Sequence, residues 1–141
     1  MKKISAIILA VCLAFVLGAC SSNVIKQEEK YTMNASYSYG GDLEKTEISY
    51  EVIISGTEKD IENIDAYEVL INMDYLDLML ENGPHSTQKE LGKTHYFKIT
   101  GNFTFNTNGK SKEEIDKMKL LEGIKIIDKD KNEVILKFNN Y

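Results

Sequence analysis

Apolar and polar residues alternate along three long stretches of the chain, the pattern typical of half-buried β-strands. The alternation covers residues 31–39, 46–54 and 95–105. Because successive side chains of a strand point to opposite faces, each stretch has one apolar and one polar face. This pattern is typical of antiparallel sheets, since parallel strands that are covered on both faces have continuous apolar runs. The sequence therefore predicts antiparallel sheets.

Shorter apolar stretches predict further strands at residues 66–73 and 124–128, with 133–138 completing a terminal hairpin. Turn-forming residues separate the strands at 40–42, 55–57, 82–84 and 128–132. Residues 74–81 fit either a strand or a short helix. Six or seven short strands in a chain of this length predict a mainly β fold, a two-sheet antiparallel sandwich.

One short helix is predicted between the strands, after residue 110. Ser111 is followed three residues later by Glu114, which is the spacing of a capping box. Ile115, Met118 and Leu121 would then share one face of the helix, and Gly123 is a candidate stop signal. A helix of about ten residues would be a connector packed on the sheets rather than part of a bundle.

The first residues are typical of an export signal. Lys2 and Lys3 give a positive start, and residues 4–17 form an almost continuous apolar run. The run is shorter than the ~20 residues that a helix needs to cross a bilayer. It ends in Leu17-Gly18-Ala19-Cys20, followed by two serines.

This ending resembles the lipobox of bacterial lipoproteins. The resemblance implies that residues 1–19 are a signal peptide that is removed and that Cys20 becomes a lipidated N-terminus, carrying acyl chains such as palmitate. Two or more chains suffice for stable membrane anchoring. The polar residues up to 30 would then be a tether, and residues 31–141 a single domain held at the extracellular face of the cell membrane.

Composition limits the chemistry of the mature chain. Without Lys2 and Lys3 it would keep 15 lysines against 22 acidic residues, a net charge of −7, which makes a nucleic-acid partner a poor expectation. Cys12 lies in the removed segment and Cys20 carries lipid, so disulfides, cysteine nucleophiles and thiolate metal sites are excluded. The many Lys, Ile and Asn residues, with no Arg, indicate an AT-rich genome and hence a Gram-positive bacterium.

The predicted loop at 128–132 carries the most suggestive polar pattern. Asp128, Asp130 and Asn132 match the opening of a calcium loop, because oxygen-bearing side chains at alternate positions can converge on a hard cation. The remainder of that motif is missing, since Glu133 stands where the loop needs Gly. A polar hairpin loop explains the same residues, and calcium binding stays open.

Other candidate chemistry is weaker. His85 and His95 lie ten residues apart, which is not a zinc-ligand spacing, and are expected at the surface or rim of the fold. Four acids between residues 58 and 65 are typical of a solvated loop. Tyr96 lies on the polar side of its strand and is expected to be exposed. The sequence thus predicts no catalytic residue, metal or cofactor, and leaves Tyr96, Asp128, Asp130 and Asn132 as candidate ligand contacts.

The order of strands and loops resembles small immunoglobulin-like domains common in bacterial surface lipoproteins. With no catalytic set in view, the leading hypothesis is a non-catalytic, lipid-anchored binding or adaptor protein whose partner is an envelope protein, a peptide or a wall polymer. Its loops at 55–65 and 81–93 are the expected contacts. One alternative is an immunity lipoprotein that captures a cationic antimicrobial peptide, drawn by the negative charge. Another is a small envelope hydrolase that uses the carboxylates of residues 58–65.

Overall fold

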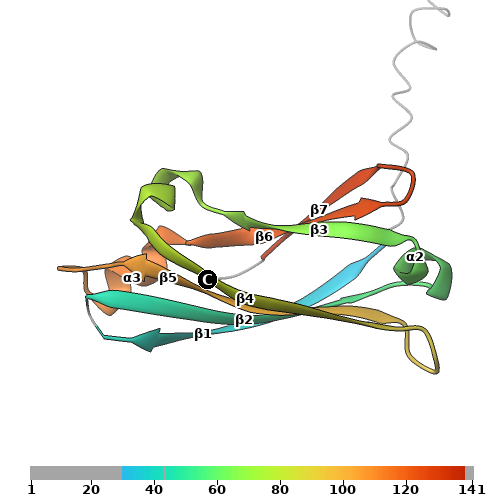
Figure 1. Ribbon diagram of the computed structural model, residues 1–141, viewed down its shortest axis with the longest axis horizontal. Coiled ribbons are helices and arrows are strands. Elements are labelled where there is room, and N and C mark those ends of the chain that lie inside the picture. The colour runs from blue at the N-terminus through green and yellow to red at the C-terminus, as the bar shows by residue number, and fades with distance from the viewer. Residues whose placement is uncertain (1–29, 43, 139–141) are drawn as a thin grey trace, which may run out of the picture.

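Two antiparallel sheets face each other in the computed structural model, which describes residues 30–42 and 44–138 (Figure 1). One sheet has the strand order β1–β2–β5–β4 and the other the order β3–β6–β7. The strands are β1 (Thr32–Gly41), β2 (Lys45–Ser55), β3 (Ile64–Ile71), β4 (Met79–Glu90), β5 (Tyr96–Asn106), β6 (Leu121–Asp128) and β7 (Glu133–Lys137). The predicted two-sheet sandwich is confirmed.

The strand order also agrees with the immunoglobulin-like arrangement. In constant-type immunoglobulin domains the seven strands, lettered A to G in chain order, form one sheet A–B–E–D and a second sheet C–F–G. If strands A to G are numbered 1 to 7, these sheets become β1–β2–β5–β4 and β3–β6–β7, which are the two sheets observed here. All five strand pairs are antiparallel.

The core lies between the sheets and follows the predicted alternation. On β2 the buried positions are every second residue from Thr46 to Ile54, and on β5 they include Phe97, Ile99, Phe103 and Phe105. The second sheet contributes mainly β6, the central strand, through Leu121, Ile124 and Ile126. Burying such a side chain fully is worth about 1.5–3 kcal/mol, so these strands provide most of the driving force for folding.

Three short helical segments close the ends of the sandwich. They are α2 (Glu58–Glu62), the 3₁₀ helix η1 (Met73–Leu78) and α3 (Lys112–Met118). The capping box predicted for α3 is present, because Ser111 and Glu114 each bond the other's backbone. The prediction of one helix was incomplete, and residues 74–81 divide between η1 and the start of β4.

Gly123 does not stop the helix. α3 ends at Met118, and the left-handed residue at its C-cap is Lys119, with φ of 48°. Gly123 lies within β6, where a Cβ would collide with the carbonyl oxygen of Leu136 on β7. Its role is therefore to let β7 approach the central strand.

The turn predicted at 82–84 is also wrong, because β4 runs through it. Asn82 and His85 of β4 are three positions apart. Their partners on β5, Phe103 and Gly101, are only two positions apart, so β4 contains a β-bulge here. The bulge and the edge position of β4 accommodate Pro84, which has no N–H for a regular ladder. The expected contact loop at 81–93 is consequently strand up to Glu90.

The two ends of the sandwich differ in what they contain. The start of β1, α2, the β4–β5 loop and the β6–β7 hairpin lie at one end, which we call the entry end (Figure 1). The β1–β2 turn, η1 and α3 lie at the other, which we call the distal end. Any anchor placed before residue 30 is thus attached at the entry end.

Candidate functional site

The β6–β7 hairpin holds Asp128, Asp130 and Asn132, and the carboxylate of Asp128 is bound within the hairpin itself. Asp128 is 4% exposed. Its Oδ1 accepts hydrogen bonds from the backbone N–H groups of Asp130 and Asn132, both at 2.9 Å, and its Oδ2 accepts one from the Asn132 side chain at 3.1 Å. These bonds close the turn, which gives the Asp-x-Asp-x-Asn pattern a structural role.

No cluster of three or more His, Cys, Asp or Glu residues able to hold a metal ion occurs within residues 30–42 and 44–138. Asp130 and Asn132 are both exposed on the hairpin, so they stay accessible to a partner.

Asp128 also binds the start of the domain. Its Oδ2 is 3.4 Å from the ammonium of Lys30, which in turn lies 4.0 Å from Asp60 on α2. The next residue, Tyr31, is buried, and its hydroxyl donates to the backbone carbonyl of Asp60. Hydrogen bonds from Asn132 are the main cause that holds the pKa of Asp128 below its ordinary value. The ionised carboxylate of Asp128 therefore fastens Lys30, just before β1, to the hairpin, while Lys30 and Tyr31 contact α2.

We expect Asp128→Asn to lower the melting temperature of the protein at pH 7, because the amide loses the charge that Lys30 and the hairpin donors recognise. A lowered pKa in the folded state gives stability that is complete above the ordinary value of about 4 and is lost as the pH falls through the lower folded value. The difference in melting temperature between the two proteins should thus shrink below pH 4. Thermal unfolding followed by circular dichroism from pH 7 to pH 3 measures it.

Asp130→Asn is the matched control, since Asp130 is exposed on the same hairpin. It should melt as the unmodified protein does at every pH. A constant deficit for Asp128→Asn across the whole pH range would show that the charge of Asp128 is not what stabilises the fold.

Tyr96 does not join the hairpin. It begins β5 in the other sheet, is half-buried, and its hydroxyl accepts a hydrogen bond from Gln88 on β4 at 3.2 Å. Tyr96 was expected to be exposed and is half-buried, with its hydroxyl bound to the side chain of Gln88 on the neighbouring edge strand. Cys20, the candidate lipid site, lies outside the described residues.

Two of the four carboxylates of residues 58–65 form contacts within the domain. Asp60 accepts a hydrogen bond from the N-cap hydroxyl of Thr57 at 2.5 Å, and Asp65 is paired with Lys131 at 2.6 Å. These contacts cap α2 and fasten β3 to the hairpin. They favour a structural role for the cluster.

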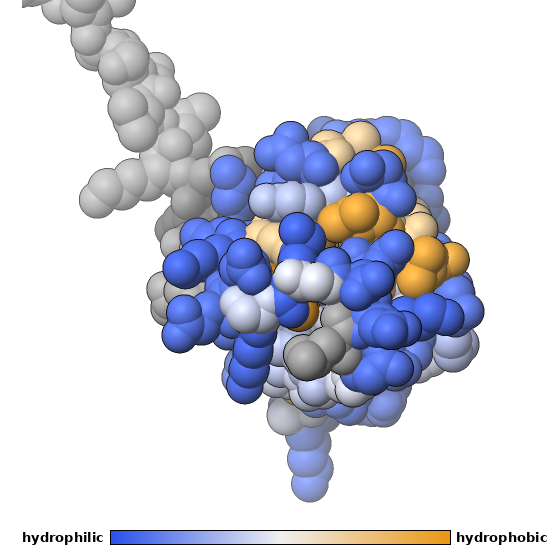
Figure 2. Space-filling view, turned by 90° about the vertical axis from the view of Figure 1, so that its left-hand side faces the viewer, coloured by the Kyte–Doolittle hydropathy of each residue, from blue (hydrophilic) through white to orange (hydrophobic). Residues whose placement is uncertain are grey.

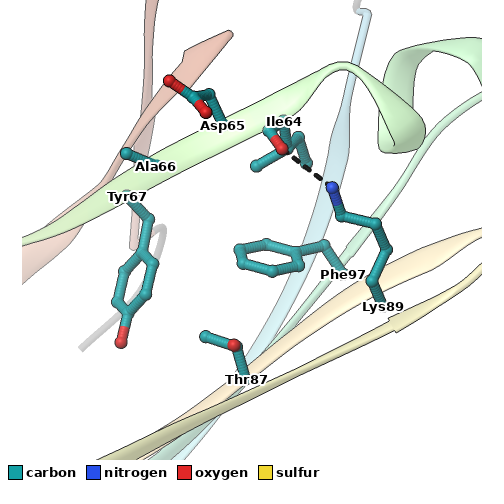
Figure 3. Close-up of a pocket in the computed structure, with 7 residues that line it drawn as sticks. All are labelled: Ile64, Asp65, Ala66, Tyr67, Thr87, Lys89 and Phe97. Atoms are coloured by element: carbon teal, nitrogen blue, oxygen red, sulfur yellow. Dashed lines mark hydrogen bonds between the residues drawn. The ribbon is translucent and has the colours of Figure 1, made fainter. Parts of the chain in front are cut away.

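A pocket of about 410 Å³ opens between the edge strands β3 and β4, and we call it the β3–β4 pocket (Figure 3). Its walls are Ile64, Ala66 and Tyr67 from β3, Thr87 and Lys89 from β4, and Phe97 from β5. Asp65 lies at its rim. The rings of Tyr67 and Phe97 meet edge to face with centroids 5.9 Å apart. The pocket lies between the outermost strands of the two sheets, since β3 and β4 each end the strand order of their sheet.

Lys89 bridges the two sheets across this pocket. Its ammonium donates to the backbone carbonyl of Ile64 at 2.8 Å and to that of Glu62 at 3.4 Å, and it lies 5.9 Å from the centre of the Phe97 ring. It has no carboxylate within 4.0 Å in the described part of the chain. The pocket thus combines an aromatic surface with a cation that forms no ion pair there.

A buried tyrosine and a histidine meet further along the same face. The hydroxyl of Tyr50 on β2 is 2.6 Å from Nδ1 of His85 on β4, and Nε2 of His85 contacts the side-chain oxygen of Asn82. Because Asn82 offers an acceptor, Nε2 carries the proton and Nδ1 accepts from Tyr50. Gly101 on β5 lies between them, and a Cβ there would collide with Nδ1 of His85.

Burial raises the pKa of Tyr50 and lowers that of His85, so the pair is neutral at pH 7. A tyrosine with a raised pKa is a poor nucleophile or base, and this contact holds β4 to the sheet. His85, which falls within the expected loop at 81–93, lies on β4 instead, and its pair with Tyr50 was not predicted. The feature of the sequence that could have indicated this pair is Gly101, because a glycine there interrupts the alternating apolar residues of β5 between Ile99 and Phe103.

The distal end exposes large apolar side chains. Met73 is 73% exposed, Leu76 39% and Leu80 48%, all within η1 and the first residues of β4. Figure 2 looks at this end and shows apolar groups open to solvent among polar ones. Among the described residues only one other large apolar side chain is comparably exposed, Ile135 on β7.

Searches against family models, curated proteins and solved structures find no match to the chain. Over residues 30–42 and 44–138, no helix has the length and apolar character needed to cross a membrane. The residues themselves therefore carry the argument for function.

Proposed function

We propose that the protein is a lipid-anchored, non-catalytic binding protein of the bacterial cell envelope, and that its partner is another envelope protein. The lipobox-like Leu17-Gly18-Ala19-Cys20 supports the anchor. The observation that carries the binding role is the exposed apolar segment at the distal end. A chain anchored before residue 30 holds the domain by its entry end, so the distal end points away from the membrane.

The aliphatic character of this surface favours a protein over a sugar polymer. Met73, Leu76 and Leu80 offer no aromatic face on which a sugar ring would stack and no fixed hydrogen-bond donors. Several large exposed apolar residues gathered at one end of an otherwise polar domain favour a protein interaction site there. Methionine in particular adapts its shape to a partner because its side chain is unbranched.

In-cell photo-cross-linking tests this proposal. A photo-reactive amino acid at position 73 or 80 should give one cross-linked adduct of defined mass, because these side chains contact the partner. The adduct should be lost on adding Leu76→Asp, which places a charge in the apolar surface. Immunoblotting detects the adduct and its loss in the Leu76→Asp variant, and mass spectrometry identifies the cross-linked partner.

The matched control places the same photo-reactive group at position 135. Ile135 is 55% exposed but belongs to β7, away from the apolar segment. No adduct from positions 73 and 80, or the same adduct from position 135, would contradict the distal end as the binding surface. An adduct that survives Leu76→Asp would contradict it as well.

A further inference from the structure

The β3–β4 pocket lies at the entry end, apart from the exposed apolar segment of the distal end. It is formed by the start of β3, the end of β4 and the start of β5. Its volume of about 410 Å³ is within the range of ≈ 300–1,000 Å³ common for small-ligand sites. Residues from three strands build it, so their backbone positions are fixed by sheet hydrogen bonds rather than by a loop.

The apolar part of the pocket is preformed. Phe97 is buried and packs edge to face on the ring of Tyr67, whose side chain points toward Thr87 in Figure 3. An edge-to-face pair keeps both rings in place without a ligand. A flat or branched apolar group entering between β3 and β4 would therefore meet ring surface and the methyl groups of Ala66 and Thr87.

The polar part is the ammonium of Lys89. An ammonium has three hydrogen-bond donors, and two of them reach the carbonyls of Ile64 and Glu62. These two bonds hold the charge at the wall of the pocket, and Figure 3 shows the one to Ile64. They do not neutralise it, since carbonyl oxygens carry only partial charge. The remaining donor and the positive charge are suited to one anionic oxygen.

The other charged group of the pocket compensates Lys89 only weakly. Asp65 lies at the rim, but its carboxylate is bound to Lys131 at 2.6 Å, and this hydrogen bond is the main cause that lowers the pKa of Asp65. Lys89 also lowers that pKa, but less than either Lys131 or Lys129 does. Figure 3 shows the Asp65 side chain pointing away from the Lys89 ammonium. An anion at the pocket wall would therefore meet a positive charge that no nearby carboxylate neutralises.

We propose that the β3–β4 pocket binds an apolar group that carries a carboxylate, with the group against Phe97 and Tyr67 and the carboxylate on Lys89. Two sources share this chemistry: a small apolar carboxylic acid, and the free C-terminus of a peptide that ends in an apolar residue. The proposal goes beyond the binding role of the distal end and does not depend on it.

Fluorine NMR of the full chain in zwitterionic nanodiscs tests the proposal with 3-(4-fluorophenyl)propionate. The acid should bind, and its amide, which has the same shape without the charge, should bind about tenfold more weakly or worse, as expected for the loss of one charge-assisted hydrogen bond. The peptide Gly-Gly-(4-fluorophenylalanine) and its C-terminal amide form the second arm, so both arms carry the fluorine that is observed. Tighter binding of the acid identifies a small molecule as the ligand class, and tighter binding of the peptide identifies a polypeptide terminus.

Variants separate the role of Lys89 from the stability of the fold. Lys89→Met keeps the side-chain stem and should lower the affinity for the acid about tenfold or more, while Lys89→Arg keeps the charge and should retain binding. Lys93→Met is the matched control, because Lys93 is exposed in the β4–β5 loop at the same end. Each variant is first shown to melt cooperatively by circular dichroism.

Equal affinity for the acid and the amide would overturn the proposal, as would unchanged acid binding by a folded Lys89→Met. Absence of binding of both the acid and the free peptide at millimolar concentration would overturn it too. None of these results bears on cross-linking from the distal end, so the two proposals fail separately.

Discussion

Ile99→Asp should leave the chain without a folded domain at 25 °C. Ile99 is 0% exposed and lies in the middle of β5, with Val52 of β2 opposite it on one side and Thr87 of β4 on the other. The substitution removes a buried apolar side chain and puts a carboxylate where no cation can reach it. Changes of this kind cost more than about 4 kcal/mol, a large part of the roughly 5–15 kcal/mol that holds a typical domain folded.

Urea unfolding followed by circular dichroism measures the effect, with limited proteolysis as a second readout. Lys98→Gln is the control, because Lys98 is the adjacent residue on the opposite face, where it pairs with Glu51 at 2.5 Å. Removing such a surface ion pair should cost no more than about 1 kcal/mol. A cooperative transition for Ile99→Asp close to that of the unmodified protein would mean that this face of β5 is not in the core.

Cys20→Ala should abolish lipid labelling of the protein completely. If the lipobox is used, the acyl chains are attached to the sulfur and to the new N-terminus at residue 20, and alanine offers no sulfur. Labelling with a fed fatty acid, followed by mass spectrometry of the N-terminus, measures the change. The mature protein should also disappear from the membrane fraction, because stable anchoring needs those chains.

Cys12→Ala provides the matched control for this experiment. Cys12 is the other cysteine of the chain and lies within the apolar run that precedes the lipobox-like residues. This variant should be labelled and anchored as the unmodified protein is. Fatty-acid label that persists on Cys20→Ala would refute the lipoprotein assignment.

The strands with a buried face could be predicted from the sequence, and the strand without one could not. β2 and β5 alternate because each has one face in the core, so their bounds are close to the predicted ones. β4 carries mostly polar residues on both faces, and none of its residues is buried. It is held by backbone pairing with β5 and by side-chain bonds such as Tyr50–His85, none of which leaves a periodic pattern.

The candidate sites show the same division. The hairpin at 128–132 could be predicted because Asp and Asn residues favour turns, and the bonding of Asp128 to the backbone follows from that chemistry. The β3–β4 pocket depends on which strands face each other across the sandwich. Lys89 and Phe97 become neighbours of Ile64 only through that arrangement, and nothing local in the sequence records it.

The placement of β1 has a mechanical consequence. The strand begins at the entry end, runs along the long axis of the sandwich, and pairs with β2 in an unbroken register from Thr32 to Gly41 (Figure 1). A force that pulls the entry end away from the distal end acts along β1, so it shears all of those pairs together instead of unzipping them in turn. Rupture under load is governed by the rate of unfolding. A domain connected in this way would yield slowly when a bound partner is dragged away from the cell.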